Sequence, residues 1–299
     1  MDTEFVRTAI AVIEERSIAA AARRLGLTAG AVALRIKALE NELGTPLIGR
    51  AGRSIAPTAS AARLLPGLRA MVDQAADLRR RASDGGGISG ELRLGTIATA
   101  STGILPPLLC ALTRRHPDLD MIIEPGTSLD LCERVLDGSL DAAIVVEPPA
   151  PLRKGERFSP WAVEPLVLIA PPACAGRDPI SLLSSETFIR YDRRNWGGRI
   201  VDRFLRTTGI VVRERIELDA LDGIVAMVSA GLGVAIIPDW TGPRLEGAKV
   251  ITLPLPPPQP TRTIGLYSRT LSIRQDLIAL LEDSHRAGTG GSAYQSAST

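Results

Sequence analysis

The sequence predicts an α/β protein in two parts: a small N-terminal helical unit with a short β-hairpin, and a larger domain of alternating strands and helices. Three observations support this prediction. Residues 17–53 have the pattern of two short helices joined by a glycine turn and followed by a basic hairpin. Residues 83–90 (SDGGGISG) have the composition of a flexible linker. Beyond them, short apolar runs alternate with helix-like segments, which is typical of α/β domains.

The N-terminal unit shows clear helix boundaries. Residues 4–15 form a first amphipathic segment that we expect to support the two helices after it. Ser17 is a suitable N-cap for an alanine-rich helix that ends at Gly26, and Thr28 caps a further helix that ends at Gly44. Apolar residues of this last helix recur at steps of four, three and four, so one face is expected to pack on a core: Val32, Ile36, Leu39 and Leu43.

Charge indicates what this unit contacts. Between Arg16 and Arg53 the chain carries seven basic residues and two acidic ones, a net charge of +5 that suits a phosphate backbone. In a helix-turn-helix the second helix enters the major groove of DNA, and a β-hairpin beside it contacts the phosphates. The DNA-binding residues predicted on this basis are Thr28, Ala29, Gly30, Ala33, Leu34, Arg35, Lys37, Arg50 and Arg53. The alternative is that Arg35 and Lys37 belong to a solvated face.

An ordered series of motifs covers about the first eighty residues: AAARRLGLT, AV, RIKALENELGTPLIGR and APTASA. The series resembles the N-terminal domain of LysR-type transcriptional regulators, which implies a winged helix-turn-helix. Where that family usually shows SQPAVSRQ, residues 28–35 are TAGAVALR. Hydrogen-bonded reading of bases should therefore be reduced, and DNA shape should matter more. The outward Leu34 indicates either a protein contact or coverage of a thymine methyl group.

A long helix is predicted from residue 58 to residue 82. Five of its residues follow a four-three-four-three spacing, which is the seam of a coiled coil and predicts a homodimer: Leu64, Leu68, Met71, Ala75 and Leu78. The alternative is that this seam packs only on its own chain. Pro66 and Gly67 interrupt the pattern and should kink or weaken the helix.

The second half carries motifs that are less specific than those of the first eighty residues: ELRLGTIAT, ILPPLL, HPDLDMIIEPG, LDGSLDAAIV and VSAGLGVAIIP. They resemble the regulatory domain of the same family, which is itself similar to two-lobed periplasmic substrate-binding proteins. Proline-rich segments at 147–160 and 254–262 are interpreted as crossovers between the lobes. The predicted organisation is a DNA-binding domain 1–57, a linker helix 58–82, a hinge 83–90, a regulatory domain 91–285 with lobe I at 91–147 and 263–285 and lobe II at 161–253, and a disordered tail 286–299.

A two-lobed domain of this kind binds a small molecule between its lobes. Hydroxyl groups and backbone N–H groups where strands lead into helices would suit an anion such as a carboxylate. The predicted effector-binding residues are Thr99, Ala100, Ser101, Thr102, Thr127 and Ser128, with Arg190 as the counter-charge. The alternatives are simple helix capping for each hydroxyl and a surface ion pair for Arg190.

Catalysis is not expected, because neither His116 nor His285 has an evident nucleophile beside it and no phosphate-cradling loop or clustered metal ligands occur. No cofactor or metal is predicted, and the effector is not identified. Three widely spaced cysteines are expected to be buried thiols of a cytoplasmic protein. The implied partners are pseudo-palindromic double-stranded DNA, a second or further copies of the chain (homodimer or homotetramer), the effector and RNA polymerase, and no membrane. The alternative function is an architectural DNA-binding protein that needs no ligand.

Overall fold

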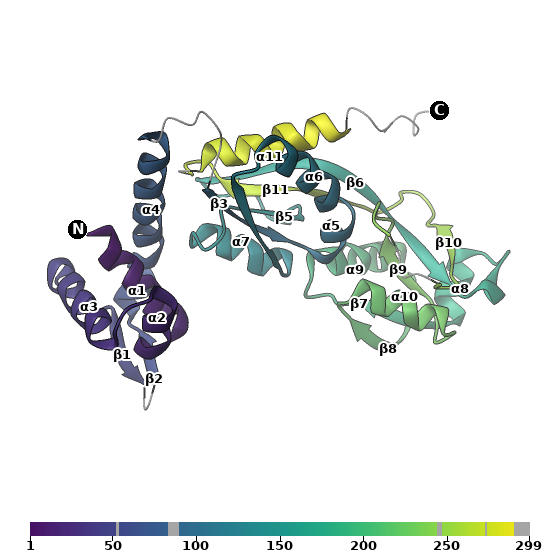
Figure 1. Ribbon diagram of the computed structural model, residues 1–299. Coiled ribbons are helices and arrows are strands. Elements are labelled where there is room, and N and C mark those ends of the chain that lie inside the picture. The colour runs from purple at the N-terminus through teal and green to yellow at the C-terminus, as the bar shows by residue number, and fades with distance from the viewer. Residues whose placement is uncertain (52–53, 83–89, 244–246, 273, 290–299) are drawn as a thin grey trace.

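The computed structural model describes residues 1–51, 54–82, 90–243, 247–272 and 274–289. A small N-terminal unit, from which a long helix rises, stands beside an elongated domain with two lobes (Figure 1). The predicted fold class is therefore confirmed. The predicted hinge 83–90 falls outside the described residues except for Gly90, and so does the last part of the predicted tail, 290–299.

The N-terminal unit is a winged helix-turn-helix. Its elements are α1 (Thr3–Glu15), α2 (Ile18–Leu25), α3 (Ala29–Leu43), β1 (Ile48–Ala51), β2 (Ser54–Pro57) and α4 (Ala59–Ala82). One apolar core joins them, and Val12 of α1, Val32 of α3 and Leu47 before the wing are completely buried in it. Pro66 lies inside α4, which continues as one helix to Ala82.

Lobe I is a sheet covered by helices on both faces. Its elements are β3 (Gly90–Thr96), α5 (Ala98–Thr102), α6 (Leu105–Arg115), β4 (Leu119–Pro125), α7 (Ser128–Leu136), β5 (Ala142–Val146), β11 (Thr261–Arg269) and α11 (Gln275–Thr289). Strand β3 runs parallel to both β4 and β5, whereas β11 is antiparallel to β5. Helices α6 and α11 lie together on one face and α7 lies on the other (Figure 1). Every residue of β5 is buried, which explains its continuous apolar run.

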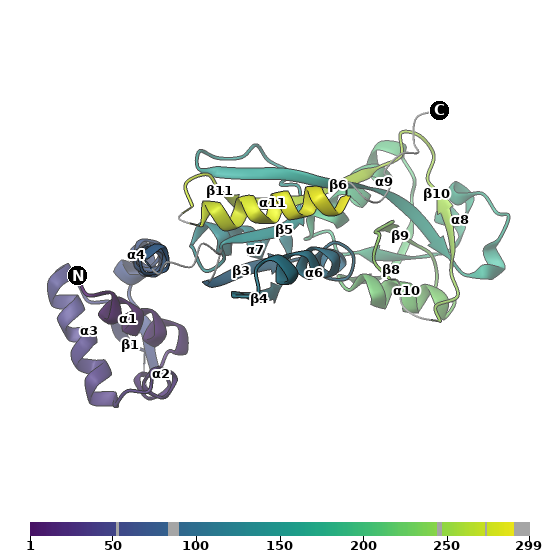
Figure 2. The same cartoon turned by 45° about the horizontal axis from the view of Figure 1, so that its top comes forward.

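Lobe II shares a strand with lobe I. Strand β6 (Glu156–Ala170) pairs with β11 over its first part and with β9 and β10 over its last part, so it crosses from one lobe to the other (Figure 2). The remaining elements of lobe II are a 3-10 turn (Pro172–Cys174), α8 (Pro179–Ser185), β7 (Thr187–Tyr191), α9 (Trp196–Thr208), β8 (Arg213–Leu218), α10 (Leu221–Ser229), β9 (Ala235–Pro238) and β10 (Ile251–Pro254).

The crossing strand corrects the predicted lobe limits. Residues 156–160 were assigned to a proline-rich crossover, but they are strand residues paired with β11 in lobe I. Pro160 and Pro165 are accommodated within β6. At the other end, α11 continues to Thr289, past residue 286 where the disordered tail was predicted to begin.

The two lobes have separate apolar cores. The core of lobe I is built on β3, β5 and β11, and that of lobe II on β6, β7 and β9. Cys132 and Cys174 are buried, whereas Cys110 is exposed, which corrects the prediction of three buried thiols. In the described part of the chain, no helix has both the length and the apolar character needed to span a bilayer.

Candidate DNA-binding surface and effector cleft

Local caps fix the two helices of the helix-turn-helix. Ser17 Oγ accepts a hydrogen bond from the N–H of Ala20 at 3.2 Å, and Thr28 Oγ1 accepts one from the N–H of Ala31 at 3.2 Å. Gly26 ends α2 with a φ of +66°, a left-handed conformation in which glycine is favoured. The short turn brings α2 across α3, and its buried alanines keep the two helices close.

The N-terminal half of α3 presents an exposed face. The predicted DNA-binding residues that lie on it and are exposed are Thr28, Ala29, Gly30, Ala33, Leu34 and Lys37. Arg35 is placed differently, because its Nη1 donates to Thr8 Oγ1 at 3.3 Å and its guanidinium lies 5.9 Å from the ring centre of Phe5. Arg35 is therefore directed back to α1, and the exposed face is built mainly from small and apolar side chains.

The wing is attached to α3 by a residue that the sequence did not single out. Glu40 Oε1 accepts hydrogen bonds from the N–H groups of Leu47 at 2.7 Å and Ile48 at 3.2 Å. Its carboxylate thus ties the start of β1 to α3. Arg50 lies in β1, opposite Ile55 of β2. Arg53 lies outside the described residues.

The predicted dimer seam of α4 is divided. Leu68 is 4% exposed, and it packs in the core of its own unit together with Leu64 and Met71. This part of α4 lies against α1, and Leu68 packs on its own chain, which is the alternative given for the seam, whereas Leu64 and Met71 are only partly buried. Beyond α1 the seam is uncovered: Leu78 is 69% exposed and Ala75 is partly exposed.

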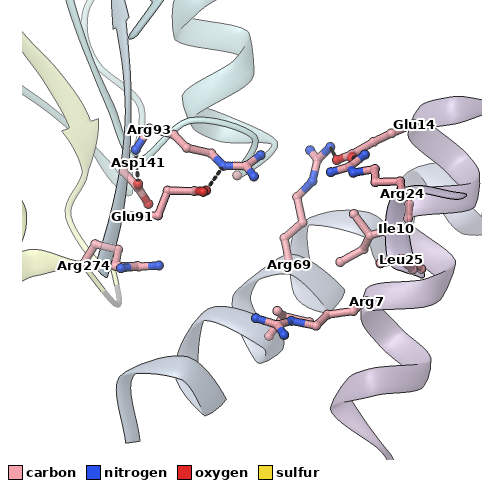
Figure 3. Close-up of a pocket in the computed structure, with 13 residues that line it drawn as sticks. Arg7, Ile10, Glu14, Arg24, Leu25, Arg69, Glu91, Arg93, Asp141 and Arg274 are labelled. Atoms are coloured by element: carbon pink, nitrogen blue, oxygen red, sulfur yellow. Dashed lines mark hydrogen bonds and ion pairs between the residues drawn. The ribbon is translucent and has the colours of Figure 1, made fainter. Parts of the chain in front are cut away.

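A cavity of about 420 Å³ separates the N-terminal unit from lobe I (Figure 3). Arg69 of α4 lies at its wall and is only 13% exposed. Arg69 Nη2 is 3.1 Å from Glu14 Oε1, and Nη1 is 3.4 Å from Asp137 Oδ1 in lobe I. Burial opposes ionisation of Glu14, but hydrogen bonds from Arg24 and Arg69 hold its pKa below the ordinary value. A largely buried cation therefore connects α1 of the DNA-binding unit to lobe I.

The first group of predicted effector residues belongs to the short helix α5. Thr99 and Ala100 are buried, Ser101 is partly exposed and Thr102 is exposed. Ser101 Oγ donates to the carbonyl of Ile97 at 3.1 Å, and Thr102 Oγ1 donates to the carbonyl of Thr99 at 3.2 Å. Both hydroxyls therefore donate to backbone carbonyls within or just before α5.

The second group begins α7. Thr127 Oγ1 accepts from the N–H of Asp130 at 3.3 Å, which is the capping role given as the alternative. Ser128 is buried, and its Oγ accepts from the N–H of Val146 at 3.1 Å. Ser128 thus joins α7 to the end of β5.

Arg190 does not have the environment predicted for it. Its side chain is 4% exposed, forms an ion pair with Glu214 and lies 3.6 Å from Asp202. The hydrogen bond from Arg190 holds the pKa of Glu214 below its ordinary value. The structure therefore corrects this prediction, since two carboxylates of its own lobe neutralise the charge of Arg190.

The buried cation beside α5 is instead Arg262 of β11. Its Nε donates to Glu164 Oε2 at 2.7 Å, and its Nη2 donates to Thr99 Oγ1 at 2.8 Å. The side chains of Arg262 and Glu164 are 1% and 6% exposed. Burial raises the pKa of Tyr191 at the end of β7, and the neighbouring Arg262 opposes that rise. Arg262 therefore contacts both lobes and the strands that connect them. The sequence signal was a charged residue at the start of an apolar strand.

The lobes also touch directly beside α5. A Cβ on Gly242 would lie 2.6 Å from Thr102 Oγ1, so only glycine fits at this approach of lobe II to α5. Trp196 at the start of α9 packs in the core of lobe I.

Both parts of the chain match family models. The model described as "LysR substrate binding domain" matches residues 85–287, and the model described as "Bacterial regulatory helix-turn-helix protein, lysR family" matches residues 4–62. The chain is 31% identical over 284 residues to a probable hydrogen peroxide-inducible genes activator of Mycobacterium avium, covering 91% of this chain and 89% of that protein. It is 26% identical over 251 residues to the uncharacterized HTH-type transcriptional regulator YfeR of Shigella flexneri, covering 83% and 82%.

Solved structures show the same fold over nearly the whole chain. A full-length OxyR variant from Pseudomonas aeruginosa superimposes with a TM-score of 0.73 at 24% identity, covering 96% of this chain and 95% of that one. Full-length CbnR complexed with its target DNA gives a TM-score of 0.66 at 22% identity, covering 96% and 100%. With a DNA-binding unit and a two-lobed domain that both match its models, the chain belongs to the LysR family of transcriptional regulators.

Proposed function

We propose that the chain is a transcriptional regulator that binds DNA as a dimer or dimer of dimers and changes its DNA contacts when a small molecule enters the cleft between its lobes. The observation that carries this proposal is the exposed face of α3 on a unit with a net charge of +5, joined to a two-lobed domain. In a helix-turn-helix this face lies in the major groove. Gel-shift titration of DNA fragments from the region upstream of its own gene, at low ionic strength, tests it: failure to shift any of them refutes the proposal.

The effector site is proposed to lie on α5 and the start of α7. Thr99, Ala100, Ser101 and Thr102 would line the lobe I side, and Thr127 and Ser128 would hold the neighbouring turn. Arg262 is the cation beside this site, because its Nη2 donates to Thr99 Oγ1, but Glu164 neutralises its charge just as Glu214 neutralises that of Arg190. Small carboxylates and aromatic acids are the expected class, because backbone N–H groups where strands lead into helices can donate to a carboxylate.

A thermal-shift screen of small carboxylates and aromatic acids tests the effector site. A compound that raises the melting temperature of the wild-type chain, but not that of a Thr99→Val variant, supports it. If no compound raises the melting temperature, the ligand-independent architectural role is favoured instead. That alternative has some support in the structure, because the side chains of Arg262, Glu164 and Thr99 already satisfy one another.

Self-association is proposed to use the far end of α4, where Ala75 and Leu78 are uncovered. Two recognition helices about 34 Å apart would read a pseudo-palindromic site. Closing the lobes around an effector would then change the spacing and bending of the DNA through the contact of Arg69 with Asp137. Sedimentation of a Leu78→Glu variant tests this part: it should dissociate at concentrations where the wild type does not.

The proposal includes no enzymatic activity and no cofactor. The proposed location of the chain is the cytoplasm, because its proposed partners, DNA and RNA polymerase, are found there.

A further inference from the structure

The exposed face of α3 lacks large polar side chains in its first two turns. Ala29, Gly30 and Ala33 are small, and Leu34 is 72% exposed. Arg35, which is the nearest cation in sequence, is occupied by Thr8 and Phe5 of α1. Leu34 is therefore the side chain that projects furthest from this part of the helix. It lies one turn before Lys37, on the same side of α3.

Charge around this apolar residue favours one class of occupant. The exposed cation Lys37 lies on the next turn, the exposed Arg23 lies in the last turn of α2, and the segment from Arg16 to Arg53 has a net charge of +5. A protein partner with an apolar groove would not need these cations, whereas duplex DNA would. In the major groove the exposed apolar group is the 5-methyl of thymine.

We propose that Leu34 determines sequence specificity by covering thymine 5-methyl groups, with Ala33 beside it leaving room for the base edge. This inference rests on the proposed DNA binding and adds how the bases are read. Methyl contacts replace hydrogen bonds at these positions, because Ala29, Ala33 and Leu34 have no side-chain donor or acceptor. The preferred half-sites are therefore those that place thymine, on either strand, under Leu34.

The test compares thymine with deoxyuridine, which lacks only the methyl group. A fragment bound by the full chain is footprinted, and each thymine of a half-site is then replaced in turn by deoxyuridine. At the one or two positions under Leu34 the dissociation constant should rise about fourfold, the factor expected for burying one methyl-sized group. Replacement at other positions should leave the dissociation constant unchanged.

Variants assign the effect to Leu34. Leu34→Ala should bind thymine DNA more weakly and should lose the difference between thymine and deoxyuridine. Leu34→Met keeps an apolar side chain and should retain most of that difference. Lys37→Ala is the matched control on the same face: it should weaken binding to both DNAs equally. Circular dichroism checks that each variant keeps the helical content of the wild type, which is expected because the position is exposed.

Several outcomes overturn the inference. If no thymine is sensitive to replacement, or if Leu34→Ala remains as sensitive as the wild type, Leu34 does not read methyl groups. If Leu34→Ala binds DNA normally but loses self-association in sedimentation, the occupant is a second copy of the chain. In these cases the proposed DNA binding itself stands. If the wild type binds no fragment, the proposed function fails and the inference fails with it.

Discussion

Removing the carboxylate of Glu164 should destabilise the regulatory domain more than any other single change at the contact between its lobes. The Arg262 side chain is 1% exposed and its ionic partner is Glu164, at 2.7 Å. Glu164→Ala leaves this cation buried without a counter-charge, which costs about 3–5 kcal/mol. Thr99→Val removes one hydrogen bond to the same cation but leaves its carboxylate, so about 1–3 kcal/mol is expected.

The double variant Glu164→Leu with Arg262→Met provides the decisive comparison. It removes both charges and fills their volume with apolar side chains, so it should be near neutral or even more stable than the wild type. The single variants Glu164→Leu and Arg262→Met should each be less stable than this double variant, so the two changes should be strongly non-additive. A matched control is Arg177→Met with Glu186→Leu, an ion pair at the surface of lobe II whose arginine side chain is 41% exposed. This pair should contribute little to the free energy of unfolding, because both of its side chains are largely open to solvent.

Tryptophan fluorescence during guanidinium unfolding is the appropriate assay. The chain has three tryptophans, Trp161, Trp196 and Trp240, and all three lie in the regulatory domain, so the signal reports that domain alone. The coincidence of the fluorescence transition with near-ultraviolet circular dichroism would establish two-state behaviour. The reasoning is refuted if Glu164→Ala costs less than about 1 kcal/mol, or if the double variant costs as much as the sum of the single changes.

The DNA-binding face, the contact between the domains and the half-buried His285 each give a further prediction. Lys37→Ala should weaken DNA binding and lower the dependence of log K on log salt by about one unit, because one phosphate contact is lost; an unchanged slope removes Lys37 from the phosphate contacts. Asp137→Asn should change stability by less than about 0.5 kcal/mol, because Asp137 is half exposed. One spin label is placed on the exposed Cys110 and another on an Ala62→Cys variant, and the labelled protein is diluted with unlabelled chain. Asp137→Asn should nevertheless broaden the distribution of distances between the two labels. An unchanged distribution contradicts the proposed domain contact. Burial lowers the pKa of His285, which stacks on Trp161 at 4.2 Å, below its ordinary value of 6.5. The unfolded chain therefore takes up the proton first as the pH falls, so stability should decrease below about pH 6.5. His285→Phe should make that decrease smaller, and equal pH profiles for the two proteins would disprove the effect.

The sequence alone determined the local structure of the N-terminal unit. Ser17 and Thr28 cap the N-termini of α2 and α3 with their side chains, and Gly26 and Gly44 end the same helices. These boundaries therefore depend only on neighbouring residues. The alternation of strands and helices in the second half was likewise readable from apolar periodicity. The motifs identified the family for the same reason, since each motif encodes a turn or a buried stripe within a few residues.

Only the tertiary structure decided which polar groups meet between the lobes and which residues of the α4 seam remain exposed. Arg190 and Arg262 both lie in apolar strands, and nothing adjacent in sequence distinguishes them. Their partners come from distant segments: Arg190 is neutralised by Glu214, whereas Arg262 meets Glu164 and Thr99. The seam of α4 has one continuous spacing, yet Leu68 is buried in its own unit and Leu78 is exposed. The spacing of apolar residues predicts that they will be buried, and a charge in an apolar strand predicts an ionic partner. Which residues provide that contact depends on the packing of the whole chain.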